Sequence, residues 1–506
     1  MDKKTVVAIA LSLLVMMSWS AWMSKKQPLE NKAVISEIPA ESSLPKAAIP
    51  VKAESLPVAA AVKTQELSLD NIEISFLEER AGIQKATFNH YKKGELWLGR
   101  GLELLGPDLA FKKSAFSPAK VEFVHTDVKK TIYKSFKFLN NKYCIDLEIN
   151  VQNDSASPLA FDWPLILGDL DFATNPVEAR YYGISLMTDE KLIHPNSRKD
   201  FQAEVIKWAG IYNRYFSIII EPLNMKFGAG IKKLDKNGSQ VYLFPAEYKI
   251  PPGRSQAFKF RIYLGPQDLQ TLSSINPDWA GIMHYGVFNF VGHLLLQLLQ
   301  GIYKVVHNWG WAIIILSLII YLCLFPLTLK QMHSMKEMQA LQPHIEELRK
   351  QYKDNPQKLN KEIMQLYREH KVNPLGGCLP MILQIPVFFA LYQVLMRSVA
   401  LRGSHFLWIK DLSEPDRLFT LPISLPLLGN EFNILPIIMA IGMFFQQKLT
   451  SSAASGTSSE QQRFMTIFFP IMFGMIFYKM PSGLVLYWFV NSTLMLLYQL
   501  RLNKKR

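Results

Sequence analysis

Cysteine is scarce in this chain, with only 3 residues among 506. Cys323 and Cys378 fall within apolar runs and Cys144 stands alone in an alternating segment, so they form no disulfide framework. The sequence also lacks a glycine-rich phosphate loop and any spacing typical of metal ligands. We therefore expect no cofactor, no metal site and no catalytic residues, and hence a protein that is not an enzyme.

Acidic residues are the minority among the charges, 42 Asp and Glu against 56 Lys and Arg, which gives a formal net charge of +14. Basic proteins often bind nucleic acid, but here no basic run lies beside aromatic residues that could stack on bases. The cations instead flank apolar runs, where anionic membrane lipid is the expected partner. Nucleic acid is left open only as part of a ribosome contact.

Apolar runs, by contrast, are abundant: 49% of the residues are hydrophobic and the mean hydropathy is +0.07. This is too apolar for an average soluble protein and too polar for a bundle lying wholly within a membrane. A water-soluble part joined to several membrane spans is therefore expected, with no small-molecule substrate.

The first apolar run covers residues 5–23, which at ~1.5 Å per residue can cross a ~30 Å hydrocarbon core. A cleaved signal peptide is the alternative, but the run is too long and ends in Trp and Met where a small-residue cleavage site is required. We predict an uncleaved signal anchor over residues 1–24 with its N-terminus in the cytoplasm. Residues 25–65 are rich in Pro, Ala, Lys, Ser and Glu and are predicted to form a flexible linker.

Residues 66–270 change to short runs in which apolar and polar residues alternate, such as 143–149 and 258–264, separated by Gly, Asn, Asp and Pro. Alternation with turn residues between the runs is typical of strands. We predict a β-sandwich domain. Its scattered histidines, which have no repeated carboxylate or serine partner nearby in the sequence, are predicted to be surface residues. They are His90, His125 and His194.

Residues 276–307 begin with Asn-Pro-Asp, the cap, first-turn proline and first-turn acid of a helix. Apolar residues then recur every three to four positions, so the segment is predicted to be an amphipathic helix. A membrane span here is the alternative, but it would place the following Lys/Arg-rich segment outside the cell, against the positive-inside rule. We therefore expect an interfacial helix on the periplasmic face.

The remaining residues, 308–506, are predicted to hold five spans near 309–329, 379–396, 432–447, 464–480 and 484–500. The basic residues follow the first span and the last one, so both of these segments belong in the cytoplasm. With the anchor this gives six spans, two cytoplasmic termini and a periplasmic β-domain. The segment 330–372 is predicted to be a cytoplasmic helical hairpin, with apolar stripes that include Met332, Met335, Met338, Leu359 and Ile363.

Several spans contain proline together with uncharged polar residues. Each proline frees a backbone carbonyl that needs a protein or water partner within lipid. The alternative is a set of ordinary kinked helices joined by interhelical hydrogen bonds. Because the polar residues are concentrated in short spans, we favour a hydrated groove open to the cytoplasm. Its candidate lining is Ser317, Tyr321, Gln384, Gln446, Tyr487 and Asn491.

Met and Phe are frequent in the second and fourth of these spans. Flexible Met side chains suit a surface that meets many different apolar helices, although an ordinary lipid-facing surface has the same composition. The third and fourth spans are also shorter than the bilayer core, so we expect the membrane to thin beside them. The candidate hydrophobic slide for substrates is Met381, Phe388, Phe389, Met465, Phe468, Met472 and Met475.

Three segments resemble the YidC membrane protein insertases: Asn308-Trp309-Gly310, Asn373 to Pro380 and Pro481 to Trp488. The resemblance implies a bacterial inner-membrane protein that inserts, folds and helps to assemble integral membrane proteins, alone or with the Sec translocon. It also implies a supersandwich fold for the periplasmic domain. The implied partners are nascent membrane proteins, Sec translocon components, and a ribosome or targeting receptor at the hairpin.

One position departs from the family pattern. YidC proteins usually carry an arginine in the first core span five residues before a proline, and this chain has Tyr321 there, before Pro326. A fixed positive charge that attracts acidic substrate tails is therefore in doubt. We expect the groove to work by hydration and hydrogen bonding instead.

Two other functions are alternatives to membrane protein insertion. A secondary transporter usually needs ionisable residues within its spans, and the five predicted core spans lack Asp and Glu. A membrane-anchored carbohydrate-active enzyme would need paired carboxylates or histidines in one cleft of the β-domain. Deletion of that domain separates the possibilities, because an insertase should keep its activity and an enzyme should lose it.

Overall fold

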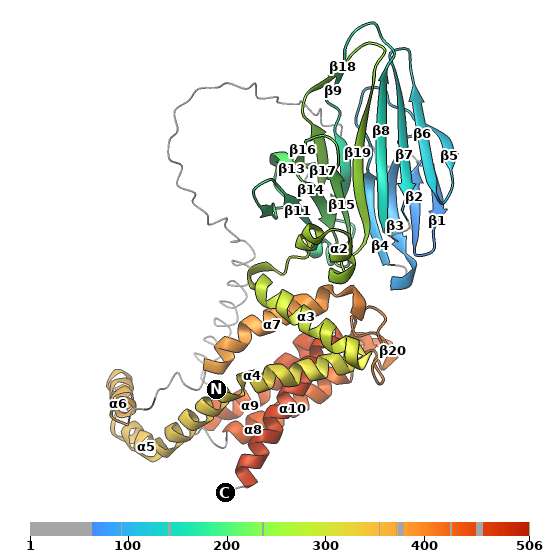
Figure 1. Cartoon of the computed structure of the whole chain (residues 1–506). Helices are drawn as coiled ribbons and strands as arrows, with labels where there is room; N and C mark the ends of the chain where they lie inside the picture. The colour runs from blue at the N-terminus through green and yellow to red at the C-terminus, as the bar shows by residue number, and fades with distance from the viewer. Residues whose placement is uncertain are drawn as a thin grey trace, which may run out of the picture. The chain divides into compact units, whose positions relative to one another are not determined.

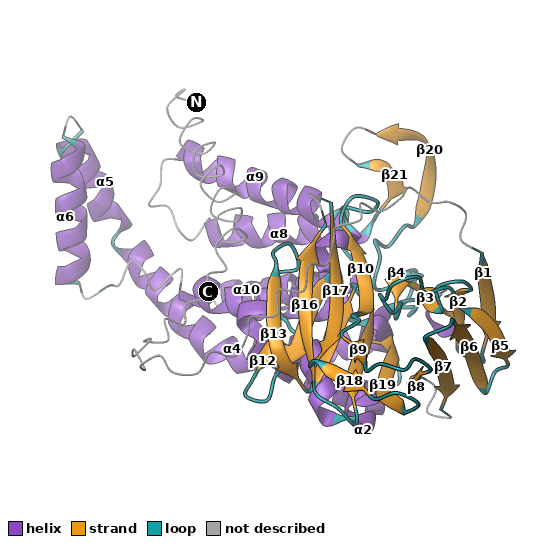
Figure 2. Cartoon of the chain, turned by 90° about the horizontal axis from the view of Figure 1, so that it is seen from above, coloured by secondary structure: helices purple, strands orange, loops and turns teal. Residues whose placement is uncertain are grey.

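The computed structural model describes residues 63–92, 94–139, 143–234, 237–353, 355–370, 372, 379–425, 428–451 and 459–504. The predicted signal anchor, nearly all of the predicted linker and residues 373–378 of the second family segment lie outside these residues. Most strands of the described chain precede the long helices, whereas the short pair β20 (Phe419–Leu425) and β21 (Gly429–Phe432) lies between α7 (Leu379–Arg397) and α8 (Leu435–Ser451) (Figures 1 and 2).

The predicted β-sandwich is confirmed. One layer is a nine-stranded sheet in the order β12-β11-β14-β15-β19-β8-β7-β6-β5. Every pairing in it is antiparallel. Its strands are β5 (Lys112–Phe116), β6 (Lys120–Thr126), β7 (Lys130–Phe138), β8 (Cys144–Asn153), β11 (Gly183–Met187), β12 (Leu192–Ile193), β14 (Trp208–Tyr212), β15 (Phe216–Pro222) and β19 (Ser255–Pro266).

The other layer consists of two four-stranded sheets, β1-β2-β3-β4 and β10-β17-β16-β13, which a bridge between Leu104 and Leu165 connects. Their strands are β1 (Thr64–Ser68), β2 (Ile72–Leu77), β3 (Gly82–Phe88), β4 (Gly94–Gly101), β10 (Leu165–Asp171), β13 (Phe201–Ile206), β16 (Phe227–Lys233) and β17 (Gly238–Pro245). A small sheet pairs β9 (Leu159–Phe161) with β18 (Tyr248–Ile250).

Aromatic side chains join the two layers. Phe76 of β2 lies 6.0 Å from Phe123 of β6, and Phe227 of β16 lies 4.9 Å from Phe260 of β19, between ring centroids. All four side chains are buried. The alternation seen in the sequence therefore places one face of each strand in a shared core, as the sandwich requires.

Strand β7 carries a lysine on its buried face. Lys130, Ile132, Lys134 and Phe136 alternate inward, and Lys134 is fully buried. Its ammonium group donates to the carbonyl of Leu102. Burial lowers the pKa of Lys134 to about 7, although the nearby charge of Glu103 partly opposes the shift. A buried amine is costly when charged, so this lysine weakens the domain at neutral and acidic pH.

We expect Lys134→Met to stabilise the β-domain by roughly 1–2 kcal/mol at pH 6, since an apolar group replaces a buried charge. The folded pKa is near 7 and the ordinary value is 10.5, so the unfolded chain binds more protons between these values. Wild-type stability should therefore rise from pH 7 to about 10, and the advantage of the variant should shrink. Thermal unfolding measured from pH 6 to 10 checks this, and an advantage independent of pH would contradict it.

The helical part begins after the last long strand. Its helices are α2 (Leu269–Ile275), α3 (Asn289–Val306), α4 (Trp309–Ala340), α5 (Gln342–Gln351), α6 (Pro356–Glu369), α7 (Leu379–Arg397), α8 (Leu435–Ser451), α9 (Ser459–Phe477) and α10 (Ser482–Lys504). Helix α4 continues without a break from its apolar half into its charged half (Figure 1). Helix α10 contacts α4, α7 and α8, and α8 also contacts α9.

Among the described residues, two helical segments are long and apolar enough to cross a membrane, Trp309–Leu329 and Ser482–Arg501. Leu435–Leu449 and Thr466–Phe477 are shorter apolar helices. A further span is predicted over helix α7. The side chains of its first residues, 379–383, are not among those that the structure describes. The six predicted spans thus remain a prediction.

The amphipathic segment differs from the single helix predicted over residues 276–307. Asn276 does cap a helical turn by accepting from the amide of Asp278, and Pro277 occupies the first position. That turn is the short 3₁₀ helix η3 (Pro277–Ile282), followed by η4 (Gly286–Phe288) and only then by α3. The backbone at Met283 is not helical, and Gly286 has a positive φ of 70°. The chain therefore changes direction before the apolar periodicity begins.

Helix α3 has two apolar faces. Leu295, Leu296 and Leu299 are buried against α4 and α7. Phe290, Leu294 and Leu298, four residues apart, are exposed. Residues spaced by four lie on one side of a helix, and such a side suits contact with lipid.

Candidate functional site

Helices α4, α7 and α10 contact one another in pairs and bring together predicted groove residues. The amide of Gln384 on α7 donates to the Tyr487 hydroxyl on α10 at 2.6 Å. One turn further along α10, the Asn491 amide donates to the Tyr487 carbonyl at 2.9 Å. Tyr487 is fully buried, whereas Gln384 and Asn491 are half-buried. Three of the six predicted groove residues thus form one polar contact group.

Tyr321 on α4 is half-buried, and its hydroxyl oxygen is buried with no hydrogen-bond partner among the described residues. Its ring lies 5.8 Å from Phe325, which in turn lies 5.0 Å from Tyr498 of α10. A buried hydroxyl without a partner is rare because it costs free energy. The position where the family usually has arginine therefore carries a buried hydroxyl that no described residue satisfies.

Tyr498 was missed by the sequence analysis. It follows Tyr487 by eleven residues and Asn491 by seven, a spacing that places the three on one face of a helix. This periodicity could have identified it. Tyr498 extends the polar face of α10 toward the end of the helix that lies away from the α9–α10 connection.

Ser317 and Gln446 are placed differently. Ser317 is fully buried, and its hydroxyl donates to the carbonyl of Ile313 in its own helix at 2.7 Å. Gln446 is half-buried on α8, which contacts α10. The helix itself satisfies the Ser317 hydroxyl, so a groove role for Ser317 or Gln446 stays a prediction.

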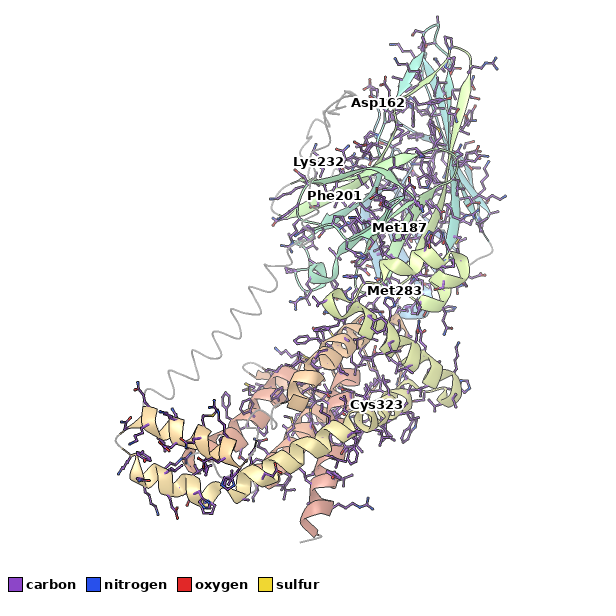
Figure 3. The ribbon with its side chains drawn as sticks, turned by 60° about the vertical axis from the view of Figure 1, so that its left-hand side comes forward. Asp162, Met187, Phe201, Lys232, Met283 and Cys323 are labelled. Atoms are coloured by element: carbon purple, nitrogen blue, oxygen red, sulfur yellow. The ribbon has the colours of Figure 1, made fainter. Side chains whose placement is uncertain are left out.

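Packing within the bundle changes along its length. On α4, residues 312, 313, 316, 317 and 320 are buried, whereas none of residues 321–327 is. On α10, residues 482–487 are all buried, and the following residues are mostly half-buried. Cys323, labelled on the ribbon of α4 in Figure 3, is exposed. The bundle is therefore tight where α4 and α10 begin and looser toward their other ends.

Phe388, one of the predicted slide residues, belongs to an aromatic cluster centred on Trp488. The Trp488 ring lies 5.2 Å from Phe388 of α7, and 5.7 Å and 5.4 Å from Phe473 and Phe477 of α9. Phe389 beside it is 48% exposed. The cluster joins three helices through ring contacts, which favour offset and edge-on geometries.

Three of the other predicted slide residues lie on α9, and the side chains of two more are not among those that the structure describes. Phe468 and Met472 are half-buried and Met475 is 53% exposed on α9. The side chains of Met381 and Met465 lie outside the described residues. Trp488 and Phe477 were not among the predicted slide residues, because the apolar pattern of one helix does not show which other helix packs against it.

Helices α5 and α6 contact each other as a hairpin. Its small core consists of Leu341, Ile345 and Val372, packed against Ile363, Leu366 and Tyr367. Predicted Leu359 is half-buried. The side chains of Met332, Met335 and Met338 lie outside the described residues. Asn355 caps α6 by accepting from the amide of Lys358 at 3.1 Å.

The expectation of surface histidines in the β-domain is wrong for two of the three. His125 is buried, and its Nε2 lies 3.3 Å from Asp127. His194 is half-buried, with Nδ1 2.8 Å from the Ser185 hydroxyl. Pairing of β11 with β12 brings Ser185 to His194, whereas Asp127 lies only two residues beyond His125. Burial and the neighbouring His284 lower the pKa of His194 to about 4, and Ser185 is fully buried, so this pair does not present a nucleophile to substrate.

The β-domain contains a cavity of about 530 Å³ lined by carboxylates and aromatic residues. Each carboxylate has a structural contact. Asp169 accepts from Gln240 at 2.8 Å, and Glu178 lies 4.0 Å from Arg214. Burial raises the pKa of Asp169 although Gln240 and Arg100 oppose this. A pair of opposed free carboxylates, as glycoside hydrolysis needs, is not formed by these two residues.

Two family models match the chain. The model described as the 60Kd inner membrane protein matches residues 301–506, and the model described as the YidC periplasmic domain matches residues 114–298. Together they cover the helical part and most of the β-domain.

Curated relatives described as "Membrane protein insertase YidC" match most or all of the chain. The protein from Syntrophus aciditrophicus is 32% identical over 565 residues, covering 100% of both chains. That from Geotalea uraniireducens is 32% identical, covering 100% of this chain and 99% of the relative. That from Syntrophobacter fumaroxidans is 38% identical over 387 residues, covering 74% and 69%.

Two solved structures show low similarity over most of the chain. An active YidC insertase with its first transmembrane domain resolved is 18% identical with a TM-score of 0.41, covering 90% of this chain and 96% of that one. YidC from Thermotoga maritima is 13% identical with a TM-score of 0.34, covering 86% and 97%.

Proposed function

The chain belongs to the YidC family of membrane protein insertases, and from this premise we propose how its residues carry out insertion. The protein is a membrane protein insertase. Polar parts of a client segment bind in the groove between α4, α7 and α10, while its apolar parts pass along the aromatic cluster at Trp488. The client then leaves sideways between α7 and α9.

The orientation proposed follows from charge. Lysine and arginine are concentrated between α4 and α6 and at the end of α10, which the positive-inside rule assigns to the cytoplasm. The β-domain is then periplasmic, both termini are cytoplasmic and the membrane is crossed six times. Exposed apolar residues four apart on α8 and α9 fit lipid contact. They are Ile437, Ile441 and Phe445, and Ile467, Ile471 and Met475.

The unpaired hydroxyl of Tyr321 carries the proposal for the groove. The hydroxyl is buried, but it lies where packing along α4 changes from tight to loose, so a small opening of this end of the bundle exposes it to water or to a client. A buried donor gains free energy when it finds an acceptor. A backbone carbonyl or polar side chain of a client supplies one. Tyr321 thus binds by hydrogen bonding, without the charge that an arginine would bring.

Short helices support the same mechanism. The apolar parts of α8 and α9, Leu435–Leu449 and Thr466–Phe477, are 15 and 12 residues long. At ~1.5 Å per residue they span about 18–23 Å, which is less than the ~30 Å hydrocarbon core. The bilayer thins beside such helices. A thinner membrane lowers the free energy of moving a hydrophilic segment across it.

Partners follow from the exposed surfaces. Nascent membrane proteins are the clients and lipids surround the apolar faces. The α5–α6 hairpin, with Arg349, Lys350 and Arg368 in the last turns of its helices, is proposed to receive a ribosome or a targeting receptor, whose surfaces are acidic or carry phosphates. Association with Sec translocon components is proposed from the family.

Reconstitution of the purified protein alone in liposomes tests this function. A small two-span client synthesised outside should become protected from protease in proportion to the amount of insertase. Empty liposomes and liposomes with an unrelated six-span protein are the controls. Protection equal to these controls would show that the protein does not insert clients by itself.

A further inference from the structure

The connection between α7 and α8 holds a buried carboxylate that reaches the β-domain. Asp411 is 5% exposed and accepts from Lys92 of the β-domain at 2.6 Å. It also accepts from the amide and hydroxyl of Ser413 at 2.9 and 2.8 Å. Burial raises the pKa of Asp411, but the bonds from Lys92, Ser413 and nearby amides outweigh it and lower the pKa overall. The carboxylate is therefore charged at neutral pH and holds the lysine.

The same loop positions the first turn of α10. The Ser482 hydroxyl donates to the Asp411 carbonyl at 3.0 Å, and the amide of Gly483 donates to the Leu412 carbonyl at 2.9 Å. The Gly483 amide is one of the backbone N–H groups that a helix leaves unpaired at its start. The β-domain thus reaches α10 through one residue of the loop.

A second β-domain residue reaches the end of α7. The guanidinium of Arg214 donates through Nε to the carbonyl of Met396 at 2.7 Å, in the last turn of that helix. In return, Arg397 of α7 donates to the carbonyl of His284 at 2.8 Å. Val394 and Val399 belong to the same buried hydrophobic cluster as the β-domain core. The end of α7 is therefore held by polar and apolar contacts together.

Helices α7 and α10 are also the two helices that the Gln384 to Tyr487 hydrogen bond joins inside the bundle. Rigid helices transmit a displacement of one end to residues several turns away. We infer that Lys92 and Arg214 are positioning residues, by which the β-domain fixes the ends of α7 and α10 and so sets the separation of the groove walls. This inference rests on the proposed function of the groove. The inference adds that the β-domain increases the rate of insertion, although insertion still takes place without this domain.

Lys92→Met tests the inference in the full chain reconstituted with the two-span client. The methionine keeps the aliphatic stem, which passes over Gly403, but loses the charge that Asp411 binds. We expect the initial insertion rate to fall about 3-fold. Lys92→Arg should restore it, because arginine can still donate to the carboxylate. The matched control is Lys85→Met, since Lys85 pairs with Glu95 within the β-domain at 3.6 Å, and it should leave the rate unchanged.

A double-mutant cycle with Tyr487→Phe distinguishes positioning from a general loss of structure. If Lys92 acts through the groove walls, the Lys92→Met, Tyr487→Phe variant should be no slower than the slower single variant. Rates that multiply would overturn the inference, as would equal rates for Lys92→Met and Lys85→Met. Loss of insertion by the wild type would instead overturn the proposed function. Melting temperatures of all variants are measured alongside, and rates are compared at a temperature at which every variant is fully folded, because removing the partner of a buried carboxylate lowers stability.

Discussion

Insertion by the Tyr321→Phe, Asn491→Leu double variant is expected to fall about 30-fold. Each substitution removes one group that can hydrogen-bond a client or the water around it. Phenylalanine keeps the ring of tyrosine and leucine keeps the branching of the asparagine side chain, so the groove keeps its shape. A net hydrogen bond contributes about 1 kcal/mol, and 1.4 kcal/mol corresponds to a factor of ten in an equilibrium or rate. Two such bonds give the expected loss. The measurement is the initial rate at which the reconstituted two-span client becomes protease-protected.

The control for this variant is Thr328→Val on the same helix as Tyr321. Thr328 is 8% exposed, and its hydroxyl donates to the carbonyl of Leu324 in its own helix at 3.2 Å. Valine replaces it at nearly the same volume, so insertion should stay within a factor of two. If the double variant inserted as fast as this control, hydrogen bonding in the groove would not contribute to insertion.

A leucine at Gly310 is expected to cost about 3 kcal/mol or more of stability. Gly310 lies in the first turns of α4, and a Cβ atom there would lie 2.1 Å from the Phe406 ring. Phe406 is 5% exposed and its ring contacts Trp311 at 5.6 Å, so it has no space to move into. Forcing extra carbon atoms into a packed site typically costs 1–3 kcal/mol, and occasionally more. A lowered melting temperature of the detergent-solubilised protein is the measurement.

Gly301→Leu is the matched control. Gly301 also lies in a helix, α3, but a Cβ atom there meets nothing within 4 Å. Leucine favours helix over glycine by close to 1 kcal/mol, so the melting temperature should stay the same or rise. If Gly310→Leu and Gly301→Leu lowered the melting temperature equally, the close contact between Gly310 and Phe406 would not be the cause of the destabilisation.

The two parts of the molecule differ in how far sequence patterns could predict them. Alternation over residues such as 143–149 identified the sandwich, because each strand buries one face regardless of its neighbours. It did not identify the burial of Lys134, although its alternate neighbours Ile132 and Phe136 are apolar. A lysine at an inward position interrupts the alternation of apolar and polar residues. The sequence does not show that its ammonium group has a partner, the carbonyl of Leu102 just after β4.

The candidate site shows the same division. Tyr321 and Asn491 could be predicted from polarity within apolar spans. Their different environments could not, because the hydroxyl of Tyr321 is unpaired while the amide of Asn491 bonds its own helix. Ser317 has the same sequence pattern as both but is satisfied inside its own helix. Spacing gives the face of a helix, and only packing gives the depth of a residue on that face.

By itself the sequence determined the family, the division into a β-domain and a set of apolar helices, and the residue types available to a groove, since these follow from local periodicity and composition. The tertiary structure alone decided which groups meet. Gln384 and Tyr487 are 103 residues apart and Lys92 and Asp411 are 319 apart, so no local pattern links them. Helix spacing is fixed by backbone geometry within a few residues, whereas contacts between distant segments depend on how whole elements pack.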